Sequence, residues 1–599
     1  MDDPRNPLLE DEYAAAADGA RRTVAASFDL HEVGVASLPR GVRQEKFRTV
    51  WRVQLGMDAF VSHLLVAVPW VFPDELPDIF SPKDLIFADT RIPHLDSSLQ
   101  VCTLDDTTRF PNPELAGEAV VELINHAAKV IRDGMTGVNR SEYWDEFEAY
   151  WIDGAKNLTS AISTVLPQGP HRRVAVVTLS PKFGHYSLLF AEADTAALDF
   201  LGAIDRLPSK LTSRTALYLH LDTIGDTPDL RTNADVYRRV PSEARWELLR
   251  YLKETERPAE VLFSIPAGSD RIFGAWVHNE YATHVYRGKK SHRLVGQAPG
   301  FRPGHLSPEV ELSSAFGSQS LGHIIVHRAD PARLTSRTVG GNQSTLGPVN
   351  VVGCGSIGGF IAQAIGYRCP STLRLVDPEN LEVHNIPRHI CDFTNVGQNK
   401  AHSVRSALRR SDPHLVIETF DQDVREVLRT NTHFLTPAQF TFVATANLAV
   451  ERRINDLSRR LDLGTVGYIW VEPHNIAGHA VVVPARSRGC FECLLGSDLN
   501  VKANVLERPG QFDRRDAGCR GSFVPYGGPD IETFVNTVVR EIVQLGELRE
   551  GAIITWIGNL DRARHNNWAI TTDWALAQSY SVYRRPIIPH SDCRICSKV

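Results

Sequence analysis

The stretch 348–366, PVNVVGCGSIGGFIAQAIG, limits what this chain can fold into more than any other. An apolar run at 349–352 is followed by Gly353, Gly355 and Gly358 in a G-x-G-x-x-G pattern, and then by residues typical of a helix. Glycines let the backbone turn sharply and approach phosphate closely, and the N–H groups at the helix start attract negative charge. The pattern predicts a strand, a nucleotide-binding loop and a helix, and it fits NAD and ATP equally well.

The residues beyond this loop repeat the alternation of strand and helix. Apolar runs at 373–376, 415–418 and 441–444 are separated by helical stretches, which indicates a doubly wound, Rossmann-like parallel sheet. Asp377 ends the second predicted strand, about 20 positions after the loop, where an acidic residue can bind ribose hydroxyls.

Three polar residues favour ATP over NAD. Asn385, Arg388 and Lys400 stand in an N-x-x-R…G-x-x-K arrangement. Hydride transfer needs no pair of cations near the phosphates. Attack on the α-phosphate of ATP needs such cations, because negative charge builds up on the phosphoryl oxygens.

The 599 residues exceed a single core, and we expect three domains. Residues 1–155 combine a helical start, strands, a Pro-rich stretch, a cysteine-bearing loop and a long helix, which predicts an α+β domain. Residues 170–330 hold strand candidates without a chemical motif, so we expect a mixed α/β linker or docking domain. Residues 331–599 form the nucleotide-binding domain.

Composition argues against several classes of partner. The net charge is −6, so nothing suggests a nucleic-acid surface. We find no apolar run near the roughly 20 residues that span a bilayer, and the acidic start of the chain lacks a signal core. We therefore expect a cytoplasmic protein that binds neither nucleic acid nor membrane.

Four of the nine cysteines form two C-x-x-C pairs, Cys490 with Cys493 and Cys593 with Cys596. Four thiolates suit a closed tetrahedral Zn²⁺ site, which is structural. The alternative is two unrelated pairs, since the pairs are far apart in the sequence.

Cys519 lies between those pairs, among glycines and close to Arg514, Arg515 and Arg520. A thiol in a basic, flexible setting can have a lowered pKa and act as a nucleophile. The alternative is an ordinary surface cysteine in a loop. For three further cysteines a buried structural role is the simpler interpretation: Cys354, Cys369 and Cys391.

Residues 331–599 resemble the ThiF/MoeB family, the adenylating domain of ubiquitin-activating-type enzymes. The resemblance makes the three glycines the nucleotide loop, Asp377 the ribose ligand, and Asn385, Arg388 and Lys400 the phosphate contacts of ATP. It also supports the zinc site and implies that Cys519 takes an acyl group from AMP.

Two positions in this segment concern the binding of the metal and of the nucleotide. The family usually has an Asp that helps to hold Mg²⁺ where this chain has Ala446, followed by Asn447. Either phosphates, water and Asn447 hold the metal, or adenylation is impaired. Arg337 is either an arginine that reaches the nucleotide, often across a dimer, or a solvated side chain.

The first segment resembles a ubiquitin-conjugating domain, through Phe72-Pro73 and Pro77 and then His94 and Cys102 in RIPHLDSSLQVC. The family's Pro and Asn after the histidine are replaced by Leu95 and Asp96, so its usual oxyanion donor is missing. His94 either fixes the loop or transfers a proton.

Together these features resemble the activating and conjugating fusion proteins of bacterial antiphage CBASS operons. The resemblance implies that ATP activates the C-terminal carboxylate of a partner protein, a cGAS-like nucleotidyltransferase. The acyl group then passes from Cys519 to Cys102 and on to a target amine, in an enzyme that is commonly a homodimer. The alternatives are a ThiF/MoeB-type enzyme of sulfur-carrier chemistry and a catalytically weak ATP-binding scaffold.

Overall fold

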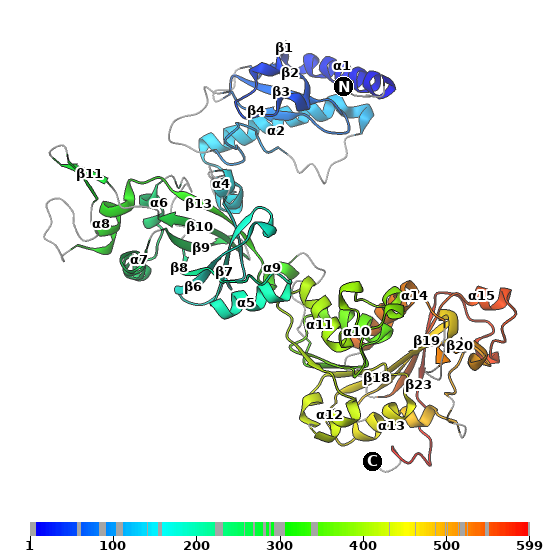
Figure 1. The fold of residues 1–599 in the computed structure, drawn as a ribbon. Coiled ribbons are helices and arrows are strands. Elements are labelled where there is room, and N and C mark those ends of the chain that lie inside the picture. The colour runs from blue at the N-terminus through cyan, green and yellow to red at the C-terminus, as the bar shows by residue number, and fades with distance from the viewer. Residues whose placement is uncertain are drawn as a thin grey trace. The chain divides into compact units, whose positions relative to one another are not determined.

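The structure is a computed structural model of the chain (Figure 1). It describes residues 7–56, 61–82, 92–103, 112–139, 142–153, 159–221, 230, 232–256, 258–267, 270–278, 283–286, 289–292, 306–336, 346–430, 432–461, 463–485, 487–496, 499, 501–512, 514–515, 522–523, 525–544 and 550–596. By contacts the chain divides into two units. One unit holds Met1–Ala197 and Pro208–Arg333, and the other holds Leu198–Leu207 and Leu334–Val599.

The N-terminal part of the first unit is an antiparallel sheet covered by two long helices. Helix α1 (Pro7–Ser27) precedes the strands, which follow one another in the sheet as β1 (Asp29–Val33), β2 (Phe47–Gln54), β3 (His63–Pro69) and β4 (Asp78–Phe80). Helix α2 (Ala116–Thr136) places an apolar stripe against the sheet and against α1. This order of elements confirms the predicted α+β fold.

Two short helices lead from this part to the next. Helices α3 (Glu142–Asp145) and α4 (Phe147–Asp153) follow α2. The Trp151 ring lies 4.9 Å from that of Phe263, and its Nε1 donates to the carbonyl oxygen of Ile324 at 2.9 Å. These contacts fix α4 on the sheet that follows.

The middle of the first unit is a closed β-barrel. Its strands neighbour one another in the order β10-β13-β5-β7-β6-β8-β9. Their bounds are β5 (Ser160–Ser163), β6 (Arg172–Thr178), β7 (Tyr186–Ala191), β8 (Ser213–His220), β9 (Ala259–Ala267), β10 (Asp270–His278) and β13 (Gly322–Arg328). The hairpin β11 (Thr283–Tyr286) and β12 (Lys289–His292) and the helices α6 (Asn233–Tyr237), α7 (Ser242–Glu254) and α8 (Pro308–Leu312) complete this part. The division between the two units falls within the helices α5 (Asp194–Ala203) and α9 (Pro331–Thr335).

The second unit is built on an eight-stranded sheet of order β16-β15-β14-β17-β18-β19-β22-β23. The strands are β14 (Val349–Val352), β15 (Leu373–Val376), β16 (Ile417–Phe420), β17 (Phe440–Val443), β18 (Thr465–Val471), β19 (Ala477–Val483), β22 (Ala552–Ile557) and β23 (Val582–Pro586). The strands β14 to β18 pair in parallel, and the last three pair antiparallel. The doubly wound sheet is confirmed, with an antiparallel extension that was not predicted.

Helices cover this sheet and place the glycine loop. They are α10 (Ser356–Gly366), α11 (Lys400–Ser411), α12 (Val424–Thr430), α13 (Leu448–Leu457), α14 (Gly528–Gln544) and α15 (Leu560–His565). Two-residue strands β20 (Arg514–Arg515) and β21 (Ser522–Phe523) form a small separate ladder.

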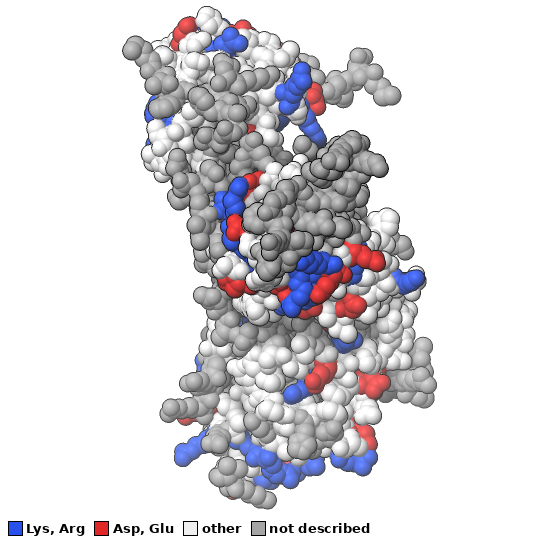
Figure 2. All heavy atoms as spheres, turned by 90° about the vertical axis from the view of Figure 1, so that its left-hand side faces the viewer, with Lys and Arg blue, Asp and Glu red and all other residues white. Residues whose placement is uncertain are grey.

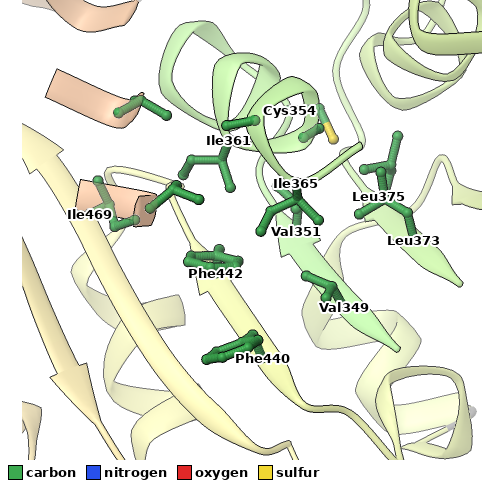
Figure 3. Close-up of a cluster of buried hydrophobic side chains, with 14 of the residues drawn as sticks. Val349, Val351, Cys354, Ile361, Ile365, Leu373, Leu375, Phe440, Phe442 and Ile469 are labelled. Carbon is green, nitrogen blue, oxygen red and sulfur yellow. The ribbon is translucent and has the colours of Figure 1, made fainter. Parts of the chain in front are cut away.

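The core beneath the glycine loop is built of buried aliphatic and aromatic side chains (Figure 3). Ile361 and Ile365 of α10 lie over Val351 of β14, with Leu375 and Phe442 on the flanking strands (Figure 3). Each fully buried side chain of this size contributes about 1.5–3 kcal/mol. The glycine loop therefore stands on a rigid base.

Charges of both signs are interspersed on the surface. On the face that Figure 2 shows, Lys and Arg lie beside Asp and Glu over the middle of the view. Among the helices of the described residues, none combines the length and the apolarity needed to cross a bilayer.

Candidate functional site

Two of the three loop glycines are required by the packing of the backbone. Gly353 has φ +86°, and a Cβ there would come within 2.6 Å of the carbonyl oxygen of Ala444. A Cβ on Gly358 would come within 1.7 Å of the carbonyl oxygen of Gly353, so α10 begins against the turn. A Cβ on Gly355 would meet nothing within 4 Å. The space before Gly355 is therefore open to a ligand at the start of α10.

Asp377 lies directly against this loop. Its Oδ2 accepts the backbone N–H of Cys354 at 2.7 Å, and its Oδ1 accepts that of Glu379 at 2.8 Å. Burial raises the pKa of Asp377, and the two N–H donors oppose this effect. The carboxylate thus orders the loop from its predicted position after β15.

His389 holds the same loop from the other side and was not predicted. Its Nδ1 accepts the N–H of Cys391 at 3.1 Å, so its Nε2 carries the proton and donates to the carbonyl oxygen of Cys354 at 2.8 Å. Burial lowers the pKa of His389, which keeps the ring neutral. No motif marks this histidine, because its role depends on a contact between distant segments.

Lys400 is brought close to Asp377 by the start of α11. The side chain of Asn399 caps α11, and its Nδ2 also donates to the backbone oxygen of Asp377 at 2.7 Å. The Lys400 side chain is 10% exposed, and its Nζ lies 2.5 Å from Oε2 of Glu379. The Glu379 side chain is 70% exposed, so a phosphate that enters the site can replace its carboxylate as the partner of the Lys400 ammonium group.

Arg388 is the second cation of the predicted set. Its guanidinium lies over the ring of Tyr526, with Cζ 4.7 Å from the ring centroid. Its Nε is buried and has no hydrogen-bond partner among the described residues. A buried donor without a partner is costly, so this atom fits an anionic ligand such as a phosphate.

Asn385 is held differently from the other predicted phosphate contacts. Its Oδ1 accepts the N–H of Glu382 at 3.0 Å and so caps the short 3₁₀ helix Val383–Arg388. The structure therefore brings Asp377, Lys400 and the glycines together, and it places Asn385 in a local turn on the same segment as Arg388.

The segment after β17 does not fit a metal ligand. Ala446 has φ +50° and offers no side-chain oxygen. Oδ1 of Asn447 caps α13 by accepting the N–H groups of Ala449 at 3.1 Å and Val450 at 3.2 Å. Both lone pairs of this oxygen are used, so Asn447 does not replace the expected Asp as a ligand of Mg²⁺.

The four cysteines of the C-x-x-C pairs meet in space. Their sulfur atoms lie within 4.8 Å of one another. The Sγ–Sγ distances are 4.0 Å for Cys490–Cys493, 3.6 Å for Cys490–Cys593 and 3.4 Å for Cys493–Cys596. A tetrahedral Zn²⁺ with Zn–S bonds of about 2.3 Å requires sulfurs about 3.8 Å apart. The alternative of two unrelated pairs is therefore wrong, and the cluster fits zinc.

The second predicted site lies at the edge of the N-terminal sheet. Gln100 pairs with Phe80 at the end of β4, and Val101 pairs with Leu95 to close a narrow loop. At its mouth the N–H of Cys102 donates to the carbonyl oxygen of His94 at 2.8 Å. Cys102 is exposed.

His94 is clamped by residues that sequence analysis missed. Its Nε2 lies 2.8 Å from Oε2 of Glu142, and its Nδ1 pairs with Oε1 of Glu146. Its backbone N–H donates to Oε2 of Glu146 at 3.1 Å and to the hydroxyl of Tyr150 at 2.9 Å. Hydrogen bonding to Cys102, and then to Glu146 and Glu142, raises the pKa of His94 to about 10, although burial opposes it. The spacing of Glu142, Glu146 and Tyr150 along one helical face is the only sequence signal for this clamp.

Two candidates lie outside the described residues. Cys519 and Arg337 belong to segments that the structure does not describe, so their predicted roles stay predictions. Of the cysteines predicted to be structural, Cys354 and Cys391 are buried and Cys369 is half-buried.

Two parts of the chain match models of known families. Residues 344–538 match the model of the ThiF family, and residues 42–159 match that of prokaryotic E2 family B. The ATP-dependent ubiquitin transferase-like protein Cap2 of Pseudomonas aeruginosa (strain BWHPSA011 / Pa011) is 26% identical over 219 residues. That match covers 34% of this chain and only 37% of the relative.

Solved structures of similar proteins include E. coli MccB with ATP and the protein PaaA. MccB is 15% identical with a TM-score of 0.29, over 42% of this chain and 66% of that one. PaaA is 15% identical with a TM-score of 0.29, over 41% of this chain and 73% of that one. From the two family matches we conclude that this polypeptide joins a prokaryotic E2 family B domain to a ThiF family domain.

Proposed function

We propose that this protein activates the C-terminal carboxylate of a partner protein with ATP and conjugates it to a target amine. The pathway is a ubiquitin-like one of bacterial antiphage defence, of the CBASS type, in the cytoplasm. The partner is a protein with a free C-terminus, for which a cGAS-like nucleotidyltransferase is the candidate, and the enzyme acts as a homodimer.

One observation carries this proposal: a nucleotide loop and an exposed cysteine beside a clamped histidine stand in the same chain. The loop, Arg388 and Lys400 suit a triphosphate, and Cys102 suits an acyl carrier. The pairing of a ThiF family domain with an E2 family domain supports the same order of events. The name of the relative, an ATP-dependent ubiquitin transferase-like protein, agrees with it.

The proposed reaction begins at the glycine loop. The partner's carboxylate attacks the α-phosphate, and pyrophosphate leaves. The N–H groups at the start of α10, together with Arg388 and Lys400, stabilise the negative charge that develops on the phosphoryl oxygens. Ala446 and Asn447 offer no ligand for Mg²⁺, so the phosphates of ATP and water would hold the ion.

Two thioesters follow the acyl adenylate. The Cys519 thiolate attacks the acyl carbonyl and releases AMP, and the Cys102 thiolate then attacks that thioester and releases Cys519. A target amine finally attacks the Cys102 thioester, losing a proton as the thiolate leaves. Splitting the transfer in this way is nucleophilic catalysis. The thiolates of four cysteines would hold zinc, which would supply a structural cross-link: Cys490, Cys493, Cys593 and Cys596.

The relay is tested on non-reducing gels. The wild type, Cys519→Ala and Cys102→Ala are each incubated with ATP and a cGAS-like nucleotidyltransferase. We expect two reducible adducts in the wild type, none in Cys519→Ala and only the first in Cys102→Ala.

The other outcomes separate the alternatives. A Cys102 adduct that forms without Cys519 contradicts the relay. An enzyme that needs Cys519 but is indifferent to Cys102 is a ThiF/MoeB-type enzyme of sulfur-carrier chemistry. ATP binding with no adduct identifies a scaffold.

A further inference from the structure

The clamp around His94 fixes the protonation state of its ring by geometry. Both ring nitrogens face carboxylate oxygens, Nε2 that of Glu142 at 2.8 Å and Nδ1 that of Glu146. An ionised carboxylate only accepts hydrogen bonds, so both nitrogens must donate, and a ring that donates twice is an imidazolium. The cation stands beside the nucleophile: a nitrogen of His94, Sγ of Cys102 and an oxygen of Glu146 lie within 4.8 Å of one another.

A protonated ring is a poor base and a strong donor. A histidine that is already charged at neutral pH takes no proton from an attacking amine. It can give a charge-assisted hydrogen bond to an oxygen that becomes negative, and such bonds are about twice as strong as neutral ones. The expected asparagine donor is absent, with Leu95 and Asp96 in its place.

We propose that the His94 imidazolium is the oxyanion donor for acyl transfer from Cys102, with Glu146 and Tyr150 as positioning residues. The proposal rests on the proposed function, since Cys102 must carry an acyl group. As the amine nitrogen bonds to the thioester carbon, the carbonyl electron pair moves to oxygen, and a ring N–H of His94 donates to it. The C–S bond then breaks, and the Cys102 thiolate leaves.

The two carboxylates have different parts in this step. Glu146 is 24% exposed, and it also binds the His94 backbone and accepts the hydroxyl of Tyr150, so its contact with Nδ1 is fixed. Glu142 is 47% exposed and lies in the short helix α3, so its contact with Nε2 is the one that exchanges. Once released, the Glu142 carboxylate is free to accept the proton that the amine loses.

A metal ion is the competing occupant of this cluster, because His94, Cys102 and Glu146 are within ligand distance of one another. Metal binding needs a ring nitrogen without a proton. Both ring nitrogens already face carboxylate oxygens, which accept hydrogen bonds and so favour an N–H at each position over a metal ion.

The test uses the full chain carrying Cys519→Ser, p-nitrophenyl acetate as the acyl probe and free lysine as the amine. Mass spectrometry follows acetylation of Cys102 and then its discharge by lysine. We expect His94→Ala to slow discharge roughly 10²-fold, the usual effect of losing one oxyanion donor. His94→Gln, which keeps an uncharged N–H donor, should recover part of this loss. His126→Gln, an exposed histidine of α2, is the matched control and should discharge at the wild-type rate.

Discharge by His94→Ala within twofold of the control overturns the proposal. This assay uses neither ATP nor a partner protein. A negative result here therefore contradicts the oxyanion role of His94 without contradicting the ATP-dependent relay, and a failed relay leaves the result of this assay intact. If His94→Ala lowers the melting temperature too far for the discharge assay, ¹³C NMR of the His94 ring in the chain with His94 intact takes the place of that assay. We expect the His94 ring to stay protonated at pH 8, and a midpoint near 6.5 would overturn the proposal. Zinc bound beyond the four-cysteine site and lost in Cys102→Ala would identify a metal site instead.

Discussion

The carboxylate of Asp377 accepts the backbone N–H of Cys354 at 2.7 Å, so the residue expected to bind ribose also fixes the loop expected to bind phosphate. Asp377 and Cys354 lie just after the neighbouring parallel strands β15 and β14, which bring them to one edge of the sheet. One carboxylate therefore links the two halves of a nucleotide site, and substitutions can separate its two roles.

We expect Asp377→Ala to lower stability by about 1–3 kcal/mol, because it leaves the buried N–H of Cys354 unsatisfied. Asp377→Asn keeps one oxygen that can accept the N–H of Cys354 but leaves the N–H of Glu379 without an acceptor, so it should lose less stability than Asp377→Ala. Both variants should bind ATP more weakly, which calorimetry with a non-hydrolysable ATP analogue measures. Equal stability of the Ala and Asn variants would show that the contact does not order the loop.

Lys400→Met should weaken ATP binding by roughly tenfold, about 1.4 kcal/mol, with little effect on adenosine, because the loss concerns phosphate alone. Arg388→Gln should act in the same direction. Arg425→Gln, an exposed cation of α12, is the control and should leave both affinities unchanged. An equal loss for ATP and adenosine would contradict the phosphate role.

Cys593→Ser should abolish stoichiometric zinc and lower the melting temperature of the C-terminal unit, because zinc in this cluster would join the segment of Cys593 and Cys596 to that of Cys490 and Cys493. Cys369→Ser, a half-buried cysteine away from the cluster, is the control and should retain zinc. Metal analysis and thermal melting measure the two effects. Full zinc content in Cys593→Ser would contradict the assignment of a zinc site to these four cysteines.

Glu451, in the first turn of α13, should make stability depend on pH. Burial raises its pKa from 4.5 to about 7, against hydrogen bonds with Asn447 and Thr445. Between pH 4.5 and about 7 the Glu451 carboxyl is ionised in the unfolded chain but keeps its proton in the folded chain. The contribution of Glu451 to the free energy of unfolding therefore falls as the pH rises from 4.5 to about 7, and it no longer changes above about 7.

Glu451→Gln should therefore stabilise the C-terminal unit at pH 8 by roughly 1–3 kcal/mol and have little effect at pH 4.5. Thermal melting at the two pH values measures the difference. Glu426→Gln, at a carboxylate of α12 whose side chain is 43% exposed, is the control and should gain nothing from burial at either pH. A pH-independent effect of Glu451→Gln would contradict the raised pKa.

Much of the fold follows from local pattern. The apolar runs predicted the strands β14, β15 and β17, because a parallel strand covered on both faces is apolar throughout. The antiparallel strands β19, β22 and β23 and the closure of the barrel were not predicted. Those features depend on pairing between distant strands, for which a single sequence holds no signal.

The sequence by itself determined the chemistry that is present: a glycine loop, two cations, two C-x-x-C pairs and a histidine eight residues before a cysteine. Residue type and short spacing suffice for such features, because they lie within one turn or one loop. Only the tertiary structure decided how these groups are held. It brought two distant cysteine pairs into one cluster, placed His389 on the glycine loop and clamped His94 between Glu142 and Glu146. Each of these contacts joins separate segments, and packing of the cores fixes them more than any local preference.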